Sequence, residues 1–164
     1  MTLPVRPGSA ADLRQAADLL NEIISIGGTT ARTSQTTAGD LGDWLTSEPD
    51  RAFWCVSEDD DGNLLGFQWI GPHPGLPPEA CDISTFVKAG QTGLGVGSRL
   101  FEATKQAALD LGYDWINANI RADNDGGLVY YQSRGFRDWD RIKGVTLQDG
   151  TIVDKIQKRY DLKD

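Results

Sequence analysis

The sequence predicts an α/β fold with a central, mostly antiparallel sheet. Three observations lead to this prediction: apolar residues recur at helical spacing in several segments, short strand-like runs lie between them, and a glycine-rich turn joins one strand directly to a helix. Along the chain the elements follow the order β-α-α-β-β-β-α-β-α-β-β. Because 164 residues are a usual size for one domain, we expect a single domain over residues 1–164.

The first part of the chain is predicted to hold one short strand and two helices. The strand closes at Val5-Arg6, and Ser9 with Asp12 resembles a capping box. The helix that follows ends at Gly27-Gly28, and its apolar positions are Leu13, Ala16, Ala17, Leu20, Ile23 and Ile24. Residues 29–37 are polar and loop-like. The second, short helix carries Leu41, Trp44 and Leu45.

The middle of the chain is predicted to form three strands. Residues 51–57 and 64–70 are typical of a hairpin whose turn is at residues 59–63. Residues 71–78 contain four of the seven prolines and predict an irregular loop. Residues 82–87 alternate as the third strand of this region.

The turn Thr92-Gly93-Leu94-Gly95-Val96-Gly97-Ser98 follows that strand and begins a helix. Its glycines let the backbone bend, and N–H groups at a helix start favour an anion. A Walker loop is excluded because Ser98 and Arg99, not Lys and Ser or Thr, follow the last glycine. The dinucleotide pattern fails because Leu100 stands at its third glycine. The turn therefore suits a phosphate or diphosphate of another ligand.

The last part of the chain alternates between helix and strand. The helix after the turn is predicted to end at Gly112, with an apolar stripe at Val96, Leu100, Ala103, Ala107 and Leu111. Residues 113–120 predict a strand. Asp123 or Asn124 can cap a short helix that runs through Tyr131 and ends at Gly135. Residues 136–147 and 151–160 predict two closing strands joined at residues 148–150.

Composition limits the function classes. The formal net charge of −8 argues against a nucleic-acid partner, which needs clustered Lys and Arg. No apolar run approaches the ~20 residues of a membrane span, and the first residues lack a signal peptide. Cys55 and Cys81 fit no metal or disulfide pattern, and His73 has no companion histidine. We therefore expect no metal, no membrane partner and a cytoplasmic location.

Three linked signals carry a family resemblance. The strand at residues 82–87 leads into the glycine turn, a further strand ends near Asn124, and Y-x-x-x-G-F follows seven residues later as Tyr131-Gln132-Ser133-Arg134-Gly135-Phe136. Together they resemble the Gcn5-related N-acetyltransferase (GNAT) superfamily over essentially the whole chain. The phosphinothricin acetyltransferase branch is the most similar, through residues 21–24, 29–31, Trp44 and the strand at residues 82–87.

The resemblance implies a GNAT-like fold and acetyl-CoA as the acetyl donor. The sheet would be splayed between its fourth and fifth strands, with helices on both faces and the cofactor in the gap. Backbone groups of Phe86 and Val87 would bind the pantetheine arm, and Asn124 would bind the pantetheine side. The diphosphate would be held by N–H groups of Leu94, Gly95, Val96, Gly97 and Ser98.

The chain departs from the superfamily pattern R/Q-x-x-G-x-G/A at its first position. Thr92 stands there, and Gln91 lies one residue too early. We expect the diphosphate site to persist because it relies mainly on backbone N–H groups. Lys88 or Arg99 would partly replace the Arg or Gln side chain that the pattern has at position 92.

The resemblance also implies two catalytic residues. Asp82 stands where the branch places an acidic general base, and Tyr131 would protonate the leaving thiolate. An alkylamine is mostly protonated at neutral pH, so a carboxylate in a partly dry cleft suits the removal of its proton. Asp82 and Ser84 share one strand face, and an amide near Phe86 can stabilise the tetrahedral intermediate.

We therefore expect an acetyl-CoA-dependent N-acetyltransferase that acts on the primary amine of a small, amino-acid-like molecule, such as phosphinothricin or methionine sulfoximine. Transfer would be direct in a ternary complex, and the branch implies a homodimer. Residues 29–37 and 71–79 would shape the acceptor pocket. Two alternatives stay open: acetylation of a protein N-terminus or lysine, and a non-catalytic acyl-CoA-binding sensor.

Several individual candidate residues also have alternative roles. Asp82 can be a surface carboxylate, and Glu22 is a rival base or substrate contact. Tyr131 can be a core residue, and Asn124 can be a helix cap only or can both cap and bind. Cys81 as an acyl carrier lacks an adjacent histidine. The remaining aromatic residues are expected to pack, namely Tyr130 and the five tryptophans Trp44, Trp54, Trp69, Trp115 and Trp139.

Overall fold

The computed structural model describes residues 4–90 and 95–163 of the chain. Its strands are β1 (Val5–Pro7), β2 (Phe53–Glu58), β3 (Leu64–Gly71), β4 (Ala80–Val87), β5 (Trp115–Arg121), β6 (Arg137–Thr146) and β7 (Ile152–Asp161). Its helices are the 3-10 helix η1 (Ala10–Asp12) and the α-helices α1 (Leu13–Ile26), α2 (Ala38–Leu45), α3 (Val96–Asp110) and α4 (Asp125–Ser133). The predicted order of elements is confirmed.

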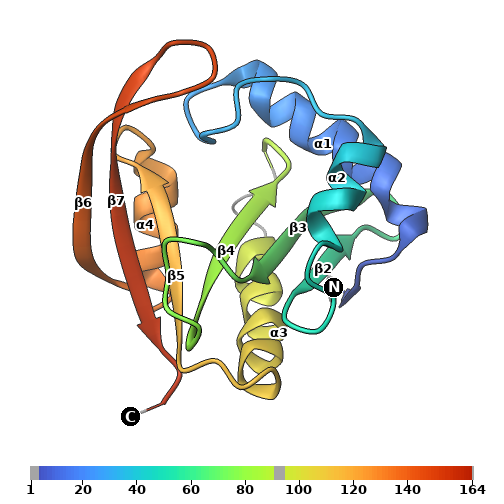
Figure 1. Ribbon diagram of the computed structural model, residues 1–164. Helices are drawn as coiled ribbons and strands as arrows, with labels where there is room; N and C mark the ends of the chain where they lie inside the picture. The colour runs from blue at the N-terminus through green and yellow to red at the C-terminus, as the bar shows by residue number, and fades with distance from the viewer. Residues whose placement is uncertain (1–3, 91–94, 164) are drawn as a thin grey trace.

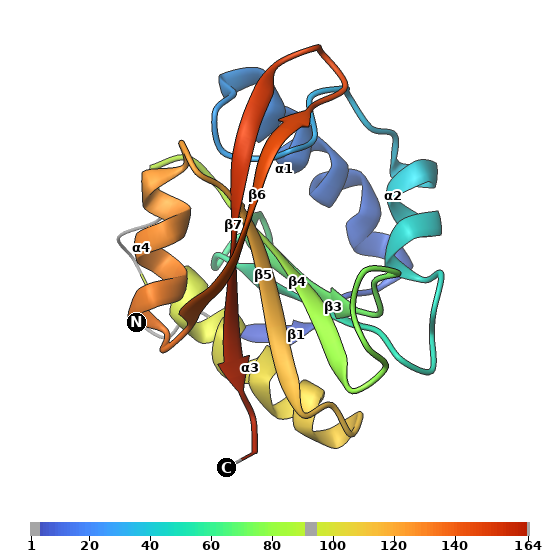
Figure 2. The ribbon, with the colours of Figure 1, turned by 60° about the vertical axis from the view of Figure 1, so that its left-hand side comes forward.

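The strands form one seven-stranded sheet in the order β1-β2-β3-β4-β5-β7-β6 (Figure 1). Every neighbouring pair is antiparallel except β4 and β5, which run parallel. The mostly antiparallel α/β class is therefore confirmed. Helices α1 and α2 lie on one side of the sheet and α3 and α4 on the other (Figure 2), as the family resemblance implies.

The sheet separates between β4 and β5. Only four residue pairs join them, Ala80–Ile83 against Trp115–Ala118. β4 stays paired with β3 as far as Val87, while β5 stays paired with β7 as far as Arg121. The two strands therefore diverge beyond residue 83 (Figure 1), and the expected splay is confirmed.

Alternating side chains of the central strands supply the core on each face. Trp54, Phe67 and Phe86 pack under α1 and α2. On the opposite face Cys81 and Ile83 pack with residues of α3 and α4. This alternation follows from the two-residue period of a strand. Successive side chains of β4 therefore point to opposite faces of the sheet.

The buried face of α3 differs from the predicted stripe. Phe101, Thr104 and Ala108 are fully or almost fully buried, whereas Ala107 and Leu111 are only partly buried. Phe101 packs against Phe136 and Tyr160, with ring centroids 5.5 and 5.3 Å away. The Thr104 hydroxyl lies 3.5 Å from the Cys55 sulfur. Val96 and Leu100 of the predicted stripe are fully buried, and the rest of the buried face follows Phe101, Thr104 and Ala108 in place of Ala103, Ala107 and Leu111.

Local signals explain the limits of the helices. Gly27, with φ of +79°, ends α1, and the Thr37 hydroxyl accepts the Asp40 N–H over 3.0 Å at the start of α2. The Ser9 N–H donates to Asp12 Oδ2 over 2.9 Å, as the capping pattern predicts. Within residues 4–90 and 95–163, every helix is too short or too polar to cross a bilayer.

Candidate active site

A cavity of ≈ 820 Å³ occupies the place where β4 and β5 separate. Each position of β4 from residue 82 to 87 lines it, so side chains of both strand faces reach it through the gap. The lining also includes the start of α3, one side of α4, residues 29–32 and Lys155 of β7. The cavity therefore lies beside the glycine turn, as the sequence predicts for the cofactor.

Asp82 lines this cavity and carries a hydrogen bond from a neighbouring strand. Asn117 Nδ2 lies 3.0 Å from Asp82 Oδ1. Burial raises the pKa of the Asp82 carboxyl above its ordinary value, and the Asn117 hydrogen bond and the nearby His73 and Lys155 oppose this rise. A carboxyl with a raised pKa is a stronger base than an exposed aspartate.

Asn117, which the sequence pattern did not single out, contacts the Asp82 carboxyl with its side chain. Asn117 is buried, with 2% exposed, and both polar atoms of its side chain form hydrogen bonds. Besides Asp82, its Nδ2 donates to Gln157 Oε1 over 3.1 Å. Its Oδ1 accepts the Trp139 Nε1–H over 2.9 Å. These bonds fix the amide so that its N–H points at the Asp82 carboxylate.

Tyr131 reaches the cavity from α4. Its hydroxyl lies 2.7 Å from Thr85 Oγ1, and Gln68 Nε2 donates to the same threonine over 2.8 Å. Burial strongly raises the pKa of the Tyr131 phenol, so it stays protonated at neutral pH. The side chain is 7% exposed and packs against Phe136, so the structure combines the core position with access to the cavity.

Tyr130 does more than pack. Its hydroxyl donates to the Gly97 carbonyl over 2.7 Å and accepts a bond of 3.2 Å from Gln68 Nε2. A Cβ at Gly97 would lie 2.7 Å from Tyr130 Cε1. Gly97 is therefore a glycine because the tyrosine ring lies against its backbone. Sequence spacing alone gave no signal for this bond between α4 and α3.

The glycine turn is described from Gly95 onward, and Leu94 lies outside the described residues, as do Gln91 and Thr92. Gly95 has φ of +79° and caps α3. Gly95, Gly97 and Ser98 line the cavity, whereas the Val96 side chain is buried in the core. The first N–H groups of a helix have no intrahelical acceptor, so this end offers donors to an anion.

The basic residues near the turn differ from those expected. Lys88 and Arg99 are not among the residues that line the cavity. Arg134, which follows α4, does line it, and its Nη1 donates to Ser98 Oγ over 2.5 Å. The sequence gave no hint of this contact because the two residues are 36 positions apart.

Asn124 lines the cavity and also caps α4. Its Oδ1 accepts the Gly127 N–H over 2.9 Å, and its Nδ2 donates to the Thr29 carbonyl over 2.9 Å. The structure therefore shows that Asn124 caps α4, and its bond to the Thr29 carbonyl ties that loop to the cavity. Phe86 and Val87 lie on the part of β4 that β5 does not pair with, so that edge of the strand borders the cavity.

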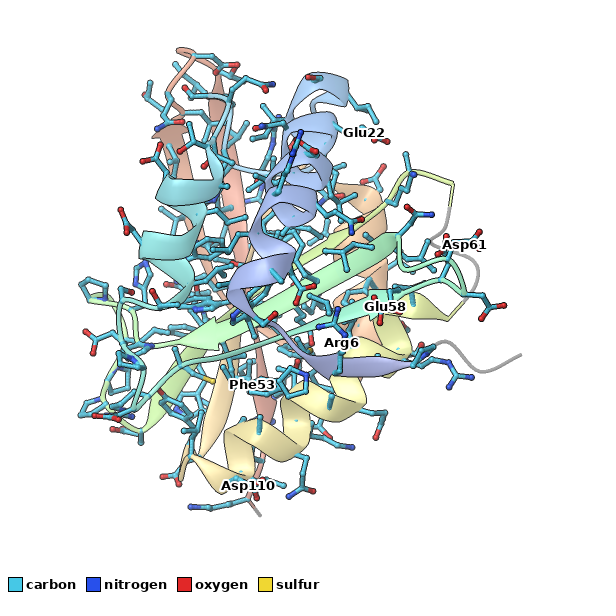
Figure 3. The ribbon with its side chains drawn as sticks, turned by 90° about the vertical axis from the view of Figure 1, so that its right-hand side faces the viewer. Arg6, Glu22, Phe53, Glu58, Asp61 and Asp110 are labelled. Carbon is cyan, nitrogen blue, oxygen red and sulfur yellow. The ribbon has the colours of Figure 1, made fainter. Side chains whose placement is uncertain are left out.

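The structure separates the rival residues from the site. Glu22 is exposed on the outward side of α1 (Figure 3) and is not among the lining residues, although Ile23 and Ile26 are. Cys81 is fully buried outside the lining, and burial raises the pKa of its thiol. The structure therefore contradicts the acyl-carrier alternative for Cys81.

The acceptor side is formed by fewer residues than expected. Of residues 29–37, only the first four line the cavity, and of residues 71–79 only His73 does. Arg32 lies over the Trp44 ring, 4.2 Å from its centroid. Among the tryptophans, Trp54, Trp69 and Trp115 are buried and Trp139 is 42% exposed. In the described ranges, no three His, Cys, Asp or Glu side chains are grouped as metal ligands.

Comparison with known sequences agrees with this geometry. Residues 18–136 match the acetyltransferase (GNAT) family. The chain is 26% identical to the phosphinothricin N-acetyltransferase of Streptomyces coelicolor, over 92% of this chain and 91% of the relative. It is 27% identical to YwnH of Bacillus subtilis, over 98% of this chain and 96% of the relative, and that protein is named provisionally as a phosphinothricin acetyltransferase.

A solved structure shares the fold. The GNAT superfamily phosphinothricin acetyltransferase of Sinorhizobium meliloti, determined in complex with acetyl-CoA, superposes with a TM-score of 0.89 at 18% identity. The superposition covers 99% of this chain and 90% of that one. Because the family match spans most of the sequence, the chain belongs to the GNAT family and is an acetyl-CoA-dependent N-acetyltransferase.

Proposed function

We propose that the protein transfers the acetyl group of acetyl-CoA directly to the primary amine of a small, amino-acid-like acceptor. One observation carries this proposal: Asp82 and Tyr131, a carboxyl and a phenol, line the same cavity at the gap between β4 and β5. Asp82 acts as the general base and Tyr131 as the general acid.

The cofactor lies along the open edge of β4 in this proposal. Backbone groups of Phe86 and Val87 bind the pantetheine arm, and Asn124 lies on the pantetheine side. N–H groups of Leu94, Gly95, Val96, Gly97 and Ser98 hold the diphosphate. Support comes from the described part of this set, which borders the cavity at the start of α3 and along β4.

The reaction then follows from the two side chains. The acceptor nitrogen loses a proton to the Asp82 carboxylate, directly or through a water, and forms a C–N bond to the thioester carbonyl carbon. A strand amide near Phe86 stabilises the oxyanion of the tetrahedral intermediate. The C–S bond breaks, the thiolate takes the proton of the Tyr131 hydroxyl, and the second proton of the acceptor nitrogen passes to the phenolate and restores it. Burial raises the pKa of Asp82, which favours its role as the base, and keeps Tyr131 protonated until the thiolate forms.

Charges in the cavity favour an acceptor that also bears an anionic group. Arg32 and Lys155 line the cavity together with Asp82. No carboxylate of the described residues forms an ion pair with either cation. A molecule with an amine and a carboxylate therefore matches both signs of charge. The names of the relatives make phosphinothricin the first acceptor to test, and methionine sulfoximine is a second amino-acid-like candidate.

The test is a thiol-release assay with acetyl-CoA and a panel of amines. The panel pairs each amino acid with its carboxamide, and it includes phosphinothricin, methionine sulfoximine and short peptides. We expect kcat/KM to be about tenfold or more higher for the amino acid than for its carboxamide, since a charge-assisted bond is lost with the carboxamide.

Two results would contradict the proposal. Faster turnover of peptides than of every small amine would favour acetylation of a protein N-terminus or lysine. Binding of CoA without turnover of any amine would favour an acyl-CoA sensor. The homodimer that the branch implies stays a separate prediction, and light scattering on the purified protein tests it.

A further inference from the structure

A guanidinium at the end of α4 reaches the start of α3. Arg134 follows the last residue of α4, and its Nη1 donates to the Ser98 hydroxyl. Both residues line the cavity. The backbone of Arg134 is held by its N–H bonds to the carbonyls of Tyr130 and Tyr131, each 3.1 Å long. The guanidinium is therefore placed beside the donors of the glycine turn before any ligand binds.

The structure leaves most of the binding capacity of this side chain unused. A guanidinium has five N–H donors, and the Ser98 bond uses one of them. Arg134 Nε is buried and has no partner among the described residues. No described carboxylate lies within 4.0 Å of the guanidinium. A partly buried cation without a counter-charge is costly until an anion binds it.

The neighbouring basic residues do not compete for this place. Arg99 follows Ser98 directly but is exposed and outside the cavity, and Lys88 is also outside it. Arg121 lines the cavity but already pairs with Asp123 over 2.8 Å. Residue 92, where the superfamily pattern has Arg or Gln, is a threonine in this chain. The sequence thus lacks the usual cation on the turn itself.

We propose that Arg134 binds the diphosphate of acetyl-CoA and replaces, from another helix, the cation that position 92 lacks. A guanidinium matches two phosphate oxygens at once, and the bond to Ser98 Oγ orients it toward the N-terminus of α3. The helix dipole and the guanidinium then act on the same anion. This proposal depends on the cofactor and not on the acceptor or on the roles of Asp82 and Tyr131.

The test compares Arg134→Gln with Arg99→Gln, which removes the same charge from the adjacent helix without touching the cavity. Three probes are used: CoA, dephospho-CoA, which lacks only the 3′-phosphate, and S-acetylpantetheine, which lacks all phosphates. Titration calorimetry gives the Kd of the two nucleotides. The ligand-induced rise in Tm is measured for all three probes, because that rise is detectable for weak ligands at high concentration.

We expect Arg134→Gln to raise the Kd of CoA and of dephospho-CoA by the same factor, about tenfold or more. The rise in Tm with S-acetylpantetheine should equal that of the unmodified protein. Arg99→Gln should change the Kd of CoA by less than about threefold, as expected for an exposed charge.

Three outcomes would overturn the proposal. An unchanged Kd would exclude contact with the phosphates, and a loss seen with CoA alone would move the contact to the 3′-phosphate. An equal loss with S-acetylpantetheine would mean that Arg134 only ties α4 to α3. Ser98→Ala tests the last of these outcomes independently. It removes the hydrogen bond that links α4 to α3 and keeps the charge of Arg134. It should retain most of the affinity for CoA.

Discussion

Asp82 and Asn117 stand opposite each other in the short parallel pairing of β4 with β5, and their side chains are joined by a hydrogen bond of 3.0 Å. The pairing ends one position later, at Ile83 and Ala118. The carboxylate is therefore held at the inner end of the gap, where the sheet is still closed. This position explains how a group on a strand can be both partly buried and open to the cavity.

Replacement of the carboxylate tests its role as the base. Asp82→Asn keeps the shape and the partner at residue 117 but cannot accept a proton. We expect kcat to fall by about 10²–10⁴, with the Kd of acetyl-CoA unchanged within about twofold. Rates come from thiol release and Kd from calorimetry. Glu22→Gln serves as the control and should keep full activity, since that side chain lies outside the cavity. A fully active Asp82→Asn would exclude the base.

The pH profile tests the hydrogen bond from Asn117. Burial raises the pKa of Asp82, and the bond from Asn117 lowers it because the bond favours the ionised form. Loss of the bond should therefore raise the pKa further. The acid limb is the fall in kcat at low pH, and its absence in Asp82→Asn would assign it to Asp82. We expect Asn117→Ala to move this limb to higher pH.

A smaller displacement of the acid limb in the same direction is expected for Trp139→Phe, which removes the bond that fixes the amide and leaves a smaller ring against Trp115. A merely structural role for Asn117 would lower activity equally at every pH and leave the limb in place. A shift of the limb to lower pH would contradict the sign of the argument.

The phenol is tested by Tyr131→Phe. The variant keeps the ring in its aromatic contacts and removes the proton donor. We expect kcat to fall by about tenfold or more, while the Kd of acetyl-CoA changes little. Stability should fall by only about 1 kcal/mol, because Thr85 keeps its bond from Gln68. Full turnover in this variant would remove Tyr131 as the acid.

Gly97→Ala tests the contact between the two helices that border the turn. Alanine normally stabilises a helix by about 1 kcal/mol relative to glycine. Here the new Cβ would lie 2.7 Å from Tyr130 Cε1, so we expect a lower Tm and weaker binding of acetyl-CoA. Gly39→Ala in α2 is the control, since the nearest atom there lies 3.8 Å away. Equal Tm changes in the two variants would refute the clash.

Stability at low pH should depend on an ion pair far from the cavity. Arg6 donates two bonds of 2.8 Å to the Asp12 carboxylate and two longer ones to Glu58 (Figure 3). The arginine lowers the pKa of Asp12, so this pair stabilises the fold above the ordinary aspartate pKa of about 4 and is lost as pH falls through the lowered value.

We therefore expect Arg6→Gln to lower the Tm at pH 7 and to have a steadily smaller effect as the pH falls through the lowered pKa of Asp12, below which the carboxyl is protonated in both states. Thermal unfolding across that range measures the difference between the two proteins. A difference that is the same at every pH would mean that the arginine acts through packing alone.

Local pattern predicted the elements well because each has a local cause. Gly27 ends α1 through its backbone conformation, and Asn124 caps α4 with its own side chain. The splay and the cavity residues of β4 came from the family resemblance. By contrast, Phe101 of α3 is buried against Phe136, and no residue near Phe101 in the sequence indicates that contact.

The missed residues of the site share a cause. Asn117 resembles any polar residue of a strand until Asp82 stands opposite it. Tyr130 was expected only to pack, since the carbonyl that its hydroxyl meets is 33 positions earlier. Arg134 occupies an unspecified position of the Y-x-x-x-G-F pattern. Such roles arise from pairs of distant residues, which a single sequence does not reveal.

The four residue pairs between β4 and β5 are all that join two larger groups of strands within the sheet. A ligand that fills the wedge beyond them bridges both groups, and any ligand held only by the folded chain raises its resistance to unfolding. In the proposed binding mode acetyl-CoA fills this wedge, so its binding would raise the Tm of the enzyme as well as supply the acetyl group.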